Sequence, residues 1–138
     1  MPKYAGYCTV VSSDSAISST SSLYNNSCKI GVILGTVADV YANYDFGEER
    51  LYCYSTYREL IAALNGGDVE CIIMTKTLAE EYTAQYNGLK ILSDPYADEA
   101  FAAFYSKNNT ALGDAIDDAI NELKRDGTID AILKKYGY

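Results

Sequence analysis

The chain has 138 residues and a net charge of −8, from 19 acidic residues against 11 lysines and arginines. Because the basic residues are few and scattered, no stripe of positive charge can neutralise phosphates, and nucleic-acid binding is excluded. The lack of histidine removes the commonest general base and metal ligand, so we expect no cofactor, no metal site and no catalytic residue.

The first part of the chain predicts two strands with an irregular connection. Residues Tyr7–Val11 are short, apolar and β-branched, which favours a strand. The serine-rich segment Ser12–Ser27 is interrupted by Ile17 and Leu23, so we expect a loop that contains a short helix. Ile30–Leu34 is a nearly continuous apolar run, typical of a buried parallel strand.

Helical patterns then begin to alternate with strands. Gly35-Thr36 predicts a turn and a helix cap, with a helix over Val37–Tyr44. A strand is expected over Leu51–Tyr54, and Thr56–Glu59 has the pattern of a capping box. The helix that follows ends at Asn65-Gly66-Gly67. Its apolar face comprises Tyr57, Leu60, Ile61 and Leu64.

The same alternation continues to residue 92. Cys71–Met74 predicts a third buried strand, Thr77–Glu80 a second capping box with a helix to about Tyr86, and Leu89–Leu92 a fourth strand. Repeated strand–helix alternation is the signature of a parallel sheet with right-handed crossovers. The expected fold class is therefore α/β, in three αβα layers with a mostly parallel sheet.

The last third of the chain has a different pattern. Ala100–Tyr105 is apolar and aromatic, which favours one more strand. Asp126-Gly127-Thr128 ends a long helix and caps a terminal helix over Ile129–Tyr136. The long helix is predicted from a stripe of apolar residues at helical spacing: Leu112, Ile116, Ala119, Ile120 and Leu123.

The four cysteines are widely spaced and include no C-x-x-C pair, which argues against a zinc site. Cys8, Cys53 and Cys71 stand in apolar runs, where a small buried thiol is expected. Cys28 has the most polar surroundings. One disulfide is compatible with this pattern, but the sequence does not select the partner of Cys28.

The sequence also contains no membrane-spanning or targeting signal. No stretch approaches the roughly 18 apolar residues of a membrane helix. The opening residues, Met1-Pro2-Lys3-Tyr4, lack the apolar region of a signal peptide. This pattern fits either a cytoplasmic protein or the mature part of an exported one.

Three segments together resemble a known family, the amino-acid class of type II periplasmic or extracellular solute-binding proteins, which are the soluble receptors of ABC transporters. The segments are IGVILGT, YSTYRELIAALNGGDVECIIM and SKNNTALGDAIDDAINELKRDGTIDAILKKYG, the last being the most specific. The resemblance runs from about Tyr4 to Gly137. It implies a non-catalytic, extracytoplasmic solute-binding protein, periplasmic or a cell-surface lipoprotein, with an ABC transporter permease as partner.

Proteins of that family have two lobes with the ligand between them, and this chain resembles the second lobe plus the C-terminal tail, the first lobe being largely missing. We therefore expect one domain over residues 1–138, with a lobe-two core over about 4–97 and a strand and C-terminal helices over 98–138. In the family these helices pack on the first lobe. Repacking on the sheet, a homodimer with swapped helices, and a fragment of a longer protein are three alternatives.

The candidate ligand site follows the strand Ile30–Leu34. Free N–H groups and the positive end of a helix dipole meet there and attract an anion. The resemblance implies a ligand carboxylate at Gly35, Thr36 and Val37. It places the partner of the ligand ammonium at Thr75, or at Met74 if the register slips, and neither residue is charged. A small anionic or amino-acid-like solute is therefore expected, and a carboxylate without an ammonium group, or no ligand, is the alternative.

Two other function classes remain open. The same fold serves as an extracytoplasmic sensor or dimerisation module in bacterial signalling proteins. A few relatives are dehydratases that use a carboxylate in the cleft, but we expect no carboxylate at the mouth formed by Gly35 and Thr36. An enzyme is therefore not predicted.

Overall fold

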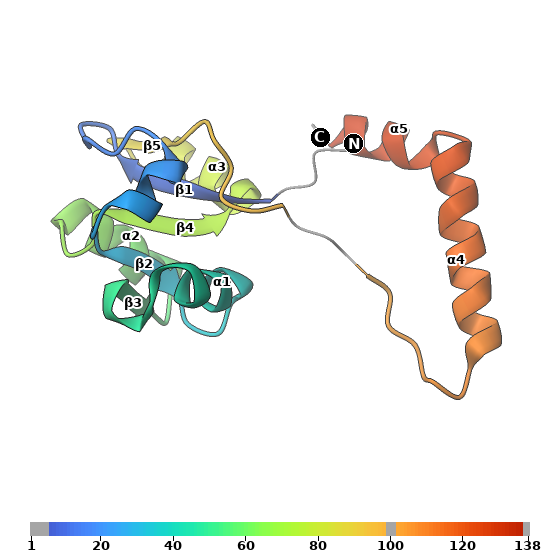
Figure 1. Cartoon of the computed structure of the whole chain (residues 1–138). Coiled ribbons are helices and arrows are strands. Elements are labelled where there is room, and N and C mark those ends of the chain that lie inside the picture. Colours follow the sequence, from blue (N-terminus) through green and yellow to red (C-terminus); the bar gives the residue numbers. More distant parts are fainter. Residues whose placement is uncertain (1–5, 99–101, 137–138) are drawn as a thin grey trace. The chain divides into compact units, whose positions relative to one another are not determined.

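The computed structural model describes residues 6–98 and 102–136, which belong to two separate units (Figure 1). The larger unit contains five strands, three α-helices and two short 3-10 helices. These elements are β1 (Tyr7–Ser12), η1 (Thr20–Asn25), β2 (Ile30–Ile33), α1 (Val37–Phe46), η2 (Glu48–Arg50), β3 (Leu51–Tyr54), α2 (Tyr57–Gly66), β4 (Cys71–Thr75), α3 (Lys76–Gln85) and β5 (Leu89–Ile91).

The strands form one sheet in the order β3-β2-β4-β1-β5. β2 is parallel to β3 and β4, with Ile30 opposite both Leu51 and Cys71. β1 pairs antiparallel with β4 and with β5, so it runs against the other four strands. The predicted α/β class is confirmed, and the sheet is mixed because β1 enters it between β4 and β5.

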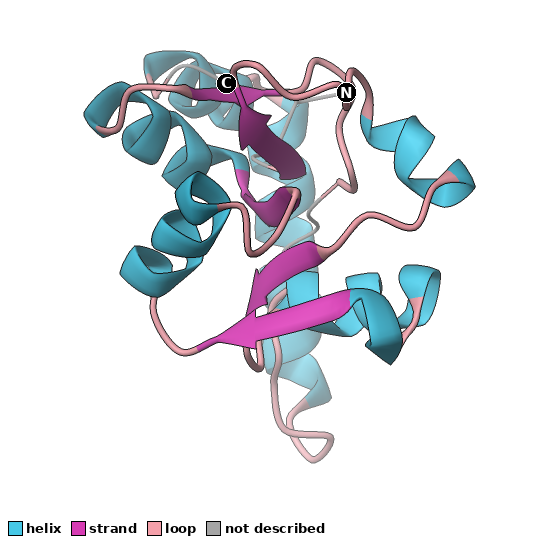
Figure 2. Ribbon diagram, turned by 90° about the vertical axis from the view of Figure 1, so that its left-hand side faces the viewer, coloured by secondary structure: helices cyan, strands magenta, loops and turns pink. Residues whose placement is uncertain are grey.

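Helices cover both faces of the sheet, which gives three layers (Figure 2). On one face, α1 and η1 pack on β2 and β4 through Ala38, Ala42 and Leu23. On the other face, α2 and α3 pack on β1 and β4. The second layer of buried residues includes three of the four residues predicted for the apolar face of α2 and one residue of α3: Leu60, Ile61, Leu64 and Ala79. Tyr57, the fourth residue of the predicted face, is partly buried and packs against this layer.

Gly31 in β2 allows α2 to lie close to the sheet. A Cβ atom at this position would lie 2.7 Å from Leu60 Cδ1 and 3.0 Å from Ile72 Cγ2. Both neighbours are fully buried, so neither can move away without disturbing the core. A glycine in this central strand therefore serves close packing rather than a turn.

The two predicted capping boxes have different outcomes. At Thr56, the hydroxyl accepts from the Glu59 amide while the Glu59 carboxylate accepts from the Thr56 amide, as predicted. The box predicted at Thr77 is wrong, because α3 already begins at Lys76, with Thr75 at the cap position. β4 runs directly into α3, which leaves no extended residue at Thr77 to serve as a cap.

Two further sequence predictions need correction. Cys53 is exposed rather than buried, because β3 is an edge strand of the sheet. The strand predicted over Ala100–Tyr105 is not present in its described part, residues 102–105, and residues 100–101 lie outside the described residues. Phe104 is 96% exposed, so this apolar side chain is not buried as the predicted strand would require.

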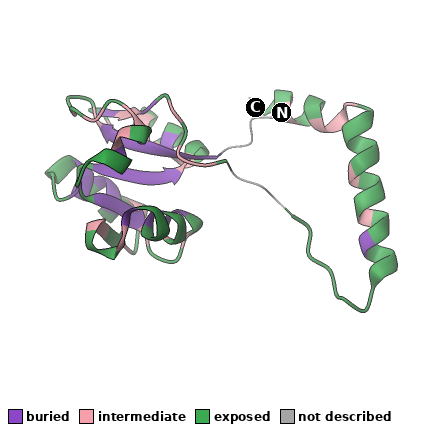
Figure 3. Ribbon diagram, viewed as in Figure 1, coloured by how far each residue is buried: buried purple, intermediate pink, exposed green. Residues whose placement is uncertain are grey.

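The smaller unit contains α4 (Thr110–Arg125) and α5 (Thr128–Lys135), which contact each other. The Asn109 side chain caps α4 by accepting from the Leu112 amide at 3.2 Å. Most of both helices is exposed, including Leu112 and Ile132 on the apolar side (Figure 3). Within the described residues, no helix is both long and apolar enough to cross a membrane.

Candidate functional site

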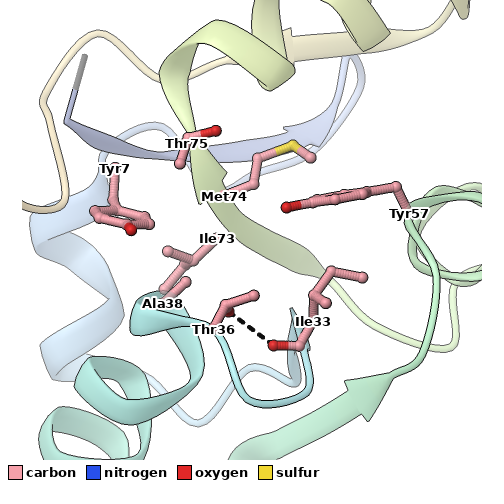
Figure 4. A pocket seen from close by; sticks show the side chains of 8 residues that line it. All are labelled: Tyr7, Ile33, Thr36, Ala38, Tyr57, Ile73, Met74 and Thr75. Atoms are coloured by element: carbon pink, nitrogen blue, oxygen red, sulfur yellow. Dashed lines mark hydrogen bonds between the residues drawn. The ribbon is translucent and has the colours of Figure 1, made fainter.

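A small pocket of about 70 Å³ lies where the carboxyl ends of β2 and β4 meet the start of α1 (Figure 4). In an open α/β sheet, this edge is where ligands usually bind. β2 and β4 are parallel neighbours, as the predicted site requires. The lining side chains are uncharged: Tyr7, Ile33, Thr36, Ala38, Tyr57, Ile73, Met74 and Thr75.

The turn between β2 and α1 shapes one wall of the pocket. Gly35 has φ +77°, a backbone conformation that residues with a side chain rarely adopt. Thr36 returns to extended backbone as the cap of α1. The Thr36 hydroxyl donates to the Ile33 carbonyl at 2.7 Å and accepts from the Asp39 amide at 3.3 Å. Its proton is therefore held by the protein, and the hydroxyl would have to rotate to donate to a ligand.

Asp39 places a carboxylate at the mouth of the turn, where the sequence predicted none, so that prediction is wrong. Its Oδ2 accepts from the Gly35 amide at 2.8 Å, and its Oδ1 accepts from the Cys53 thiol at 3.6 Å. Burial and the nearby Asp39 raise the pKa of Cys53, so the thiol keeps its proton. The Gly35 N–H, predicted to bind a ligand, is thus already bonded to the protein.

Two amides at the start of α1 remain available for an anion. The first N–H groups of any helix have no partner within the helix. In the described part of the chain, those of Val37 and Ala38 also meet no side-chain acceptor. Ala38 lines the pocket and Val37 is half exposed beside it. These two N–H groups, together with the helix dipole, form the electropositive part of the site.

Met74 and Thr75 complete the wall opposite Thr36, as Figure 4 shows. Both end β4, and Thr75 also occupies the cap position of α3. The Thr75 side chain makes no capping hydrogen bond. Thr75 is partly exposed, and its hydroxyl is the neutral polar group that β4 contributes to this wall.

Two tyrosines of the pocket were missed by sequence reasoning. Tyr7 comes from β1, and Tyr57 begins α2, its hydroxyl pointing toward the pocket in Figure 4. Burial, with Tyr82 nearby, raises the pKa of Tyr57, which therefore remains a hydrogen-bond donor at neutral pH. The signal for Tyr57 was its place just after β3, because carboxyl ends of parallel strands share one edge.

The structure thus brings Thr36, Met74 and Thr75 of the predicted set together around one pocket. Gly35 lies in the adjoining turn and Val37 begins α1, and neither residue lines the pocket. Throughout residues 6–98 and 102–136, no cluster of side chains is arranged to hold a metal ion.

Known proteins of one family are similar to this chain in sequence and in fold. The family model described as bacterial extracellular solute-binding proteins, family 3, matches residues 46–138. The glutamate-binding protein GluB of Corynebacterium glutamicum is 28% identical over 90 residues, covering 61% of this chain and 30% of that protein. The glutamine-binding protein GlnH of an ABC transporter of Bacillus subtilis is 23% identical over 96% of this chain and 48% of its own length.

Solved structures give the same result for the fold. An ancestral arginine-binding protein bound to glutamine superposes with a TM-score of 0.70 and 26% identity, covering 99% of this chain and 62% of that chain. The substrate-binding protein of an amino-acid ABC transporter has a TM-score of 0.68 and 26% identity, covering 96% and 59%. The chain therefore spans less than two thirds of the length of these relatives.

Proposed function

The chain belongs to the bacterial extracellular solute-binding proteins, family 3, and from this premise we propose that its pocket binds the carboxylate group of an amino acid or a related small acid. The family membership predicted from the sequence is confirmed. A solute-binding rather than a catalytic role is part of the proposal and is supported by that membership. The ligand and the binding role of these particular residues are the proposal.

The observation that supports this proposal most directly is the pair of unpartnered amides at the start of α1, beside a pocket at the sheet edge. A hydrogen bond from a backbone N–H to a carboxylate contributes about 1.5–3 kcal/mol. The helix dipole adds about 0.3–1 kcal/mol for an anion in the first turn. Asp39 opposes this attraction, because its own negative charge lies one residue beyond Ala38.

The lining indicates which part of a solute this chain holds. The pocket has a volume of about 70 Å³, well below the roughly 300–1,000 Å³ of pockets that enclose a drug-sized ligand, so it holds only part of a solute. Its walls carry hydroxyl and apolar groups but no charge that could pair with an ammonium group. We therefore propose that the chain contributes the carboxylate subsite, and that Thr75 gives a weaker, neutral contact to the rest of the solute.

The family also suggests the location and the partner of the protein. We propose an extracytoplasmic protein, periplasmic or a cell-surface lipoprotein, that delivers its solute to an ABC transporter permease. Relatives are described as binding glutamate and glutamine, so these are the first solutes to test. A homodimer with swapped C-terminal helices stays a prediction, which the solution mass of the 138-residue chain would test.

The proposal is tested by thermal shift and calorimetry of the chain against glutamate, glutamine, arginine, and succinate as a carboxylate without an ammonium group. We expect stabilisation that requires a carboxylate and is lost with the corresponding amides or amines. A chain that stays folded and shows no response to any acid at millimolar concentration would contradict the proposal.

A further inference from the structure

Two buried cysteines face each other at the amino ends of β2 and β4, at the end of these strands opposite the pocket. Cys28 lies just before β2 and Cys71 begins β4, and their sulfur atoms are 3.9 Å apart. Both belong to the same layer of buried residues, beside Ile30 and Phe46. They therefore sit at the amino ends of strands whose carboxyl ends form the solute pocket.

We propose that Cys28 and Cys71 form a disulfide bond when the protein is in an oxidising compartment. A disulfide has a sulfur–sulfur distance of about 2.05 Å, so each sulfur must move by about 1 Å. That movement is within reach of side-chain rotation, because both thiols already point at each other. The family to which the chain belongs is extracellular, where disulfides form and persist.

The other cysteines are placed where they cannot compete within the folded protein. Cys8 is buried in the layer on the other face of the sheet, among the residues that α2 and α3 cover. Cys53 is exposed on the edge strand β3, where its thiol contacts Asp39. The structure thus selects the partner of Cys28 that the sequence left open.

Arg50 prepares Cys28 for the reaction. Its guanidinium donates to the Cys28 sulfur at 3.4 Å and to the Cys28 carbonyl at 3.1 Å. The hydrogen bond from Cys71, opposed by burial and assisted by Arg50, lowers the pKa of Cys28 to about 7. The same pairing raises the pKa of Cys71, so one proton is held on Cys71 and the thiolate forms at Cys28.

The chemistry is a two-step exchange with a disulfide oxidant such as oxidised glutathione. The Cys28 thiolate, the more exposed of the pair, attacks one sulfur of the oxidant, whose S–S bond breaks to release one thiolate. Cys28 then carries no charge, so Cys71 can lose its proton and attack the Cys28 sulfur. The second thiolate leaves, and the two cysteines have lost two electrons to the oxidant.

Peptide mapping after oxidation tests the proposal. The folded chain is incubated with oxidised glutathione, quenched in acid, alkylated and cleaved with trypsin. Trypsin leaves Cys8 and Cys28 in one peptide, residues 4–29, and Cys71 in another, residues 59–76. We expect these peptides to be joined, and to stay joined in a Cys8→Ser variant, which assigns the bond to Cys28.

Cys53→Ser is the matched control, which should keep the bond, whereas Cys28→Ser should lose it. The bond closes a segment in which the two cysteines are 43 positions apart, so oxidation should raise the thermal midpoint of the wild type by about 10 °C. If a variant misfolds, fragmentation of the linked wild-type peptides between Cys8 and Cys28 assigns the bond instead. Peptides that stay unlinked after incubation with excess oxidised glutathione, or a bond between Cys71 and Cys53, would overturn the proposal.

Discussion

Replacing Val37 with proline removes one backbone N–H from the proposed carboxylate subsite and leaves the helix in place. Val37 is the first residue of α1, where an N–H has no partner within the helix and proline is well tolerated. Thr36 before it is extended, with φ −83° and ψ 166°, as a residue preceding proline must be. Val37 is 46% exposed, so little packing is lost.

The expected effect is on binding rather than on stability. Loss of one charge-assisted hydrogen bond, about 1.5–3 kcal/mol, weakens carboxylate binding by about 10- to 150-fold. Calorimetry of Val37→Pro against Val37→Ala, which keeps the N–H, isolates that bond, and urea unfolding checks that both variants are as stable as wild type. Equal affinity of the two variants for the acid would refute the assignment of the Val37 amide.

Three further predictions concern the local structure. Thr36→Ala should lower the free energy of unfolding by about 1 kcal/mol through loss of the cap, measured by urea unfolding, while Thr36→Ser should not. Gly31→Ala should cost about 1–3 kcal/mol in the same assay because its Cβ has no room beside Leu60, and Gly66→Ala, with its nearest neighbour at 3.9 Å, should be tolerated. Asp94 gives a pH-dependent prediction. Burial raises the pKa of its carboxyl, but hydrogen bonds from the Thr20 and Ser21 amides outweigh burial and lower that pKa. The ionised carboxylate therefore stabilises the fold above its unfolded pKa near 4. That stability is lost as the pH falls through the lower pKa of the folded state. The difference in free energy of unfolding between wild type and Asp94→Asn, measured by acid unfolding, should therefore shrink below about pH 4. A difference that stays constant with pH would contradict this prediction.

Local patterns predicted most of the elements, because each of them depends on residues close in sequence. The Thr36 and Thr56 caps and the buried face of α2 follow from side chains within one or two helical turns. The position of β1 does not. Val10 and Val11 are buried on opposite faces, as a strand inside a sheet requires, but nothing local says that β1 lies between β4 and β5.

The candidate site was predictable to the same extent. The turn Gly35-Thr36 was found from its place between a strand and a helix, and the end of β4 was found from the family resemblance. Tyr7 could not be found without the order of the strands, which brings β1 to that edge, whereas Tyr57 had a signal in its place just after β3. Asp39 was overlooked because its carboxylate turns back along the chain to the Gly35 amide rather than outward.

The central claim is that backbone amides at the start of α1 receive a carboxylate. Amide chemical shifts of the 15N-labelled chain, followed while succinate and glutamate are added to millimolar concentration, test it most directly. We predict that the largest changes occur at Val37 and Ala38, with smaller ones at Thr75. Changes confined to other parts of the chain, or none at any amide of the folded protein, would contradict the claim.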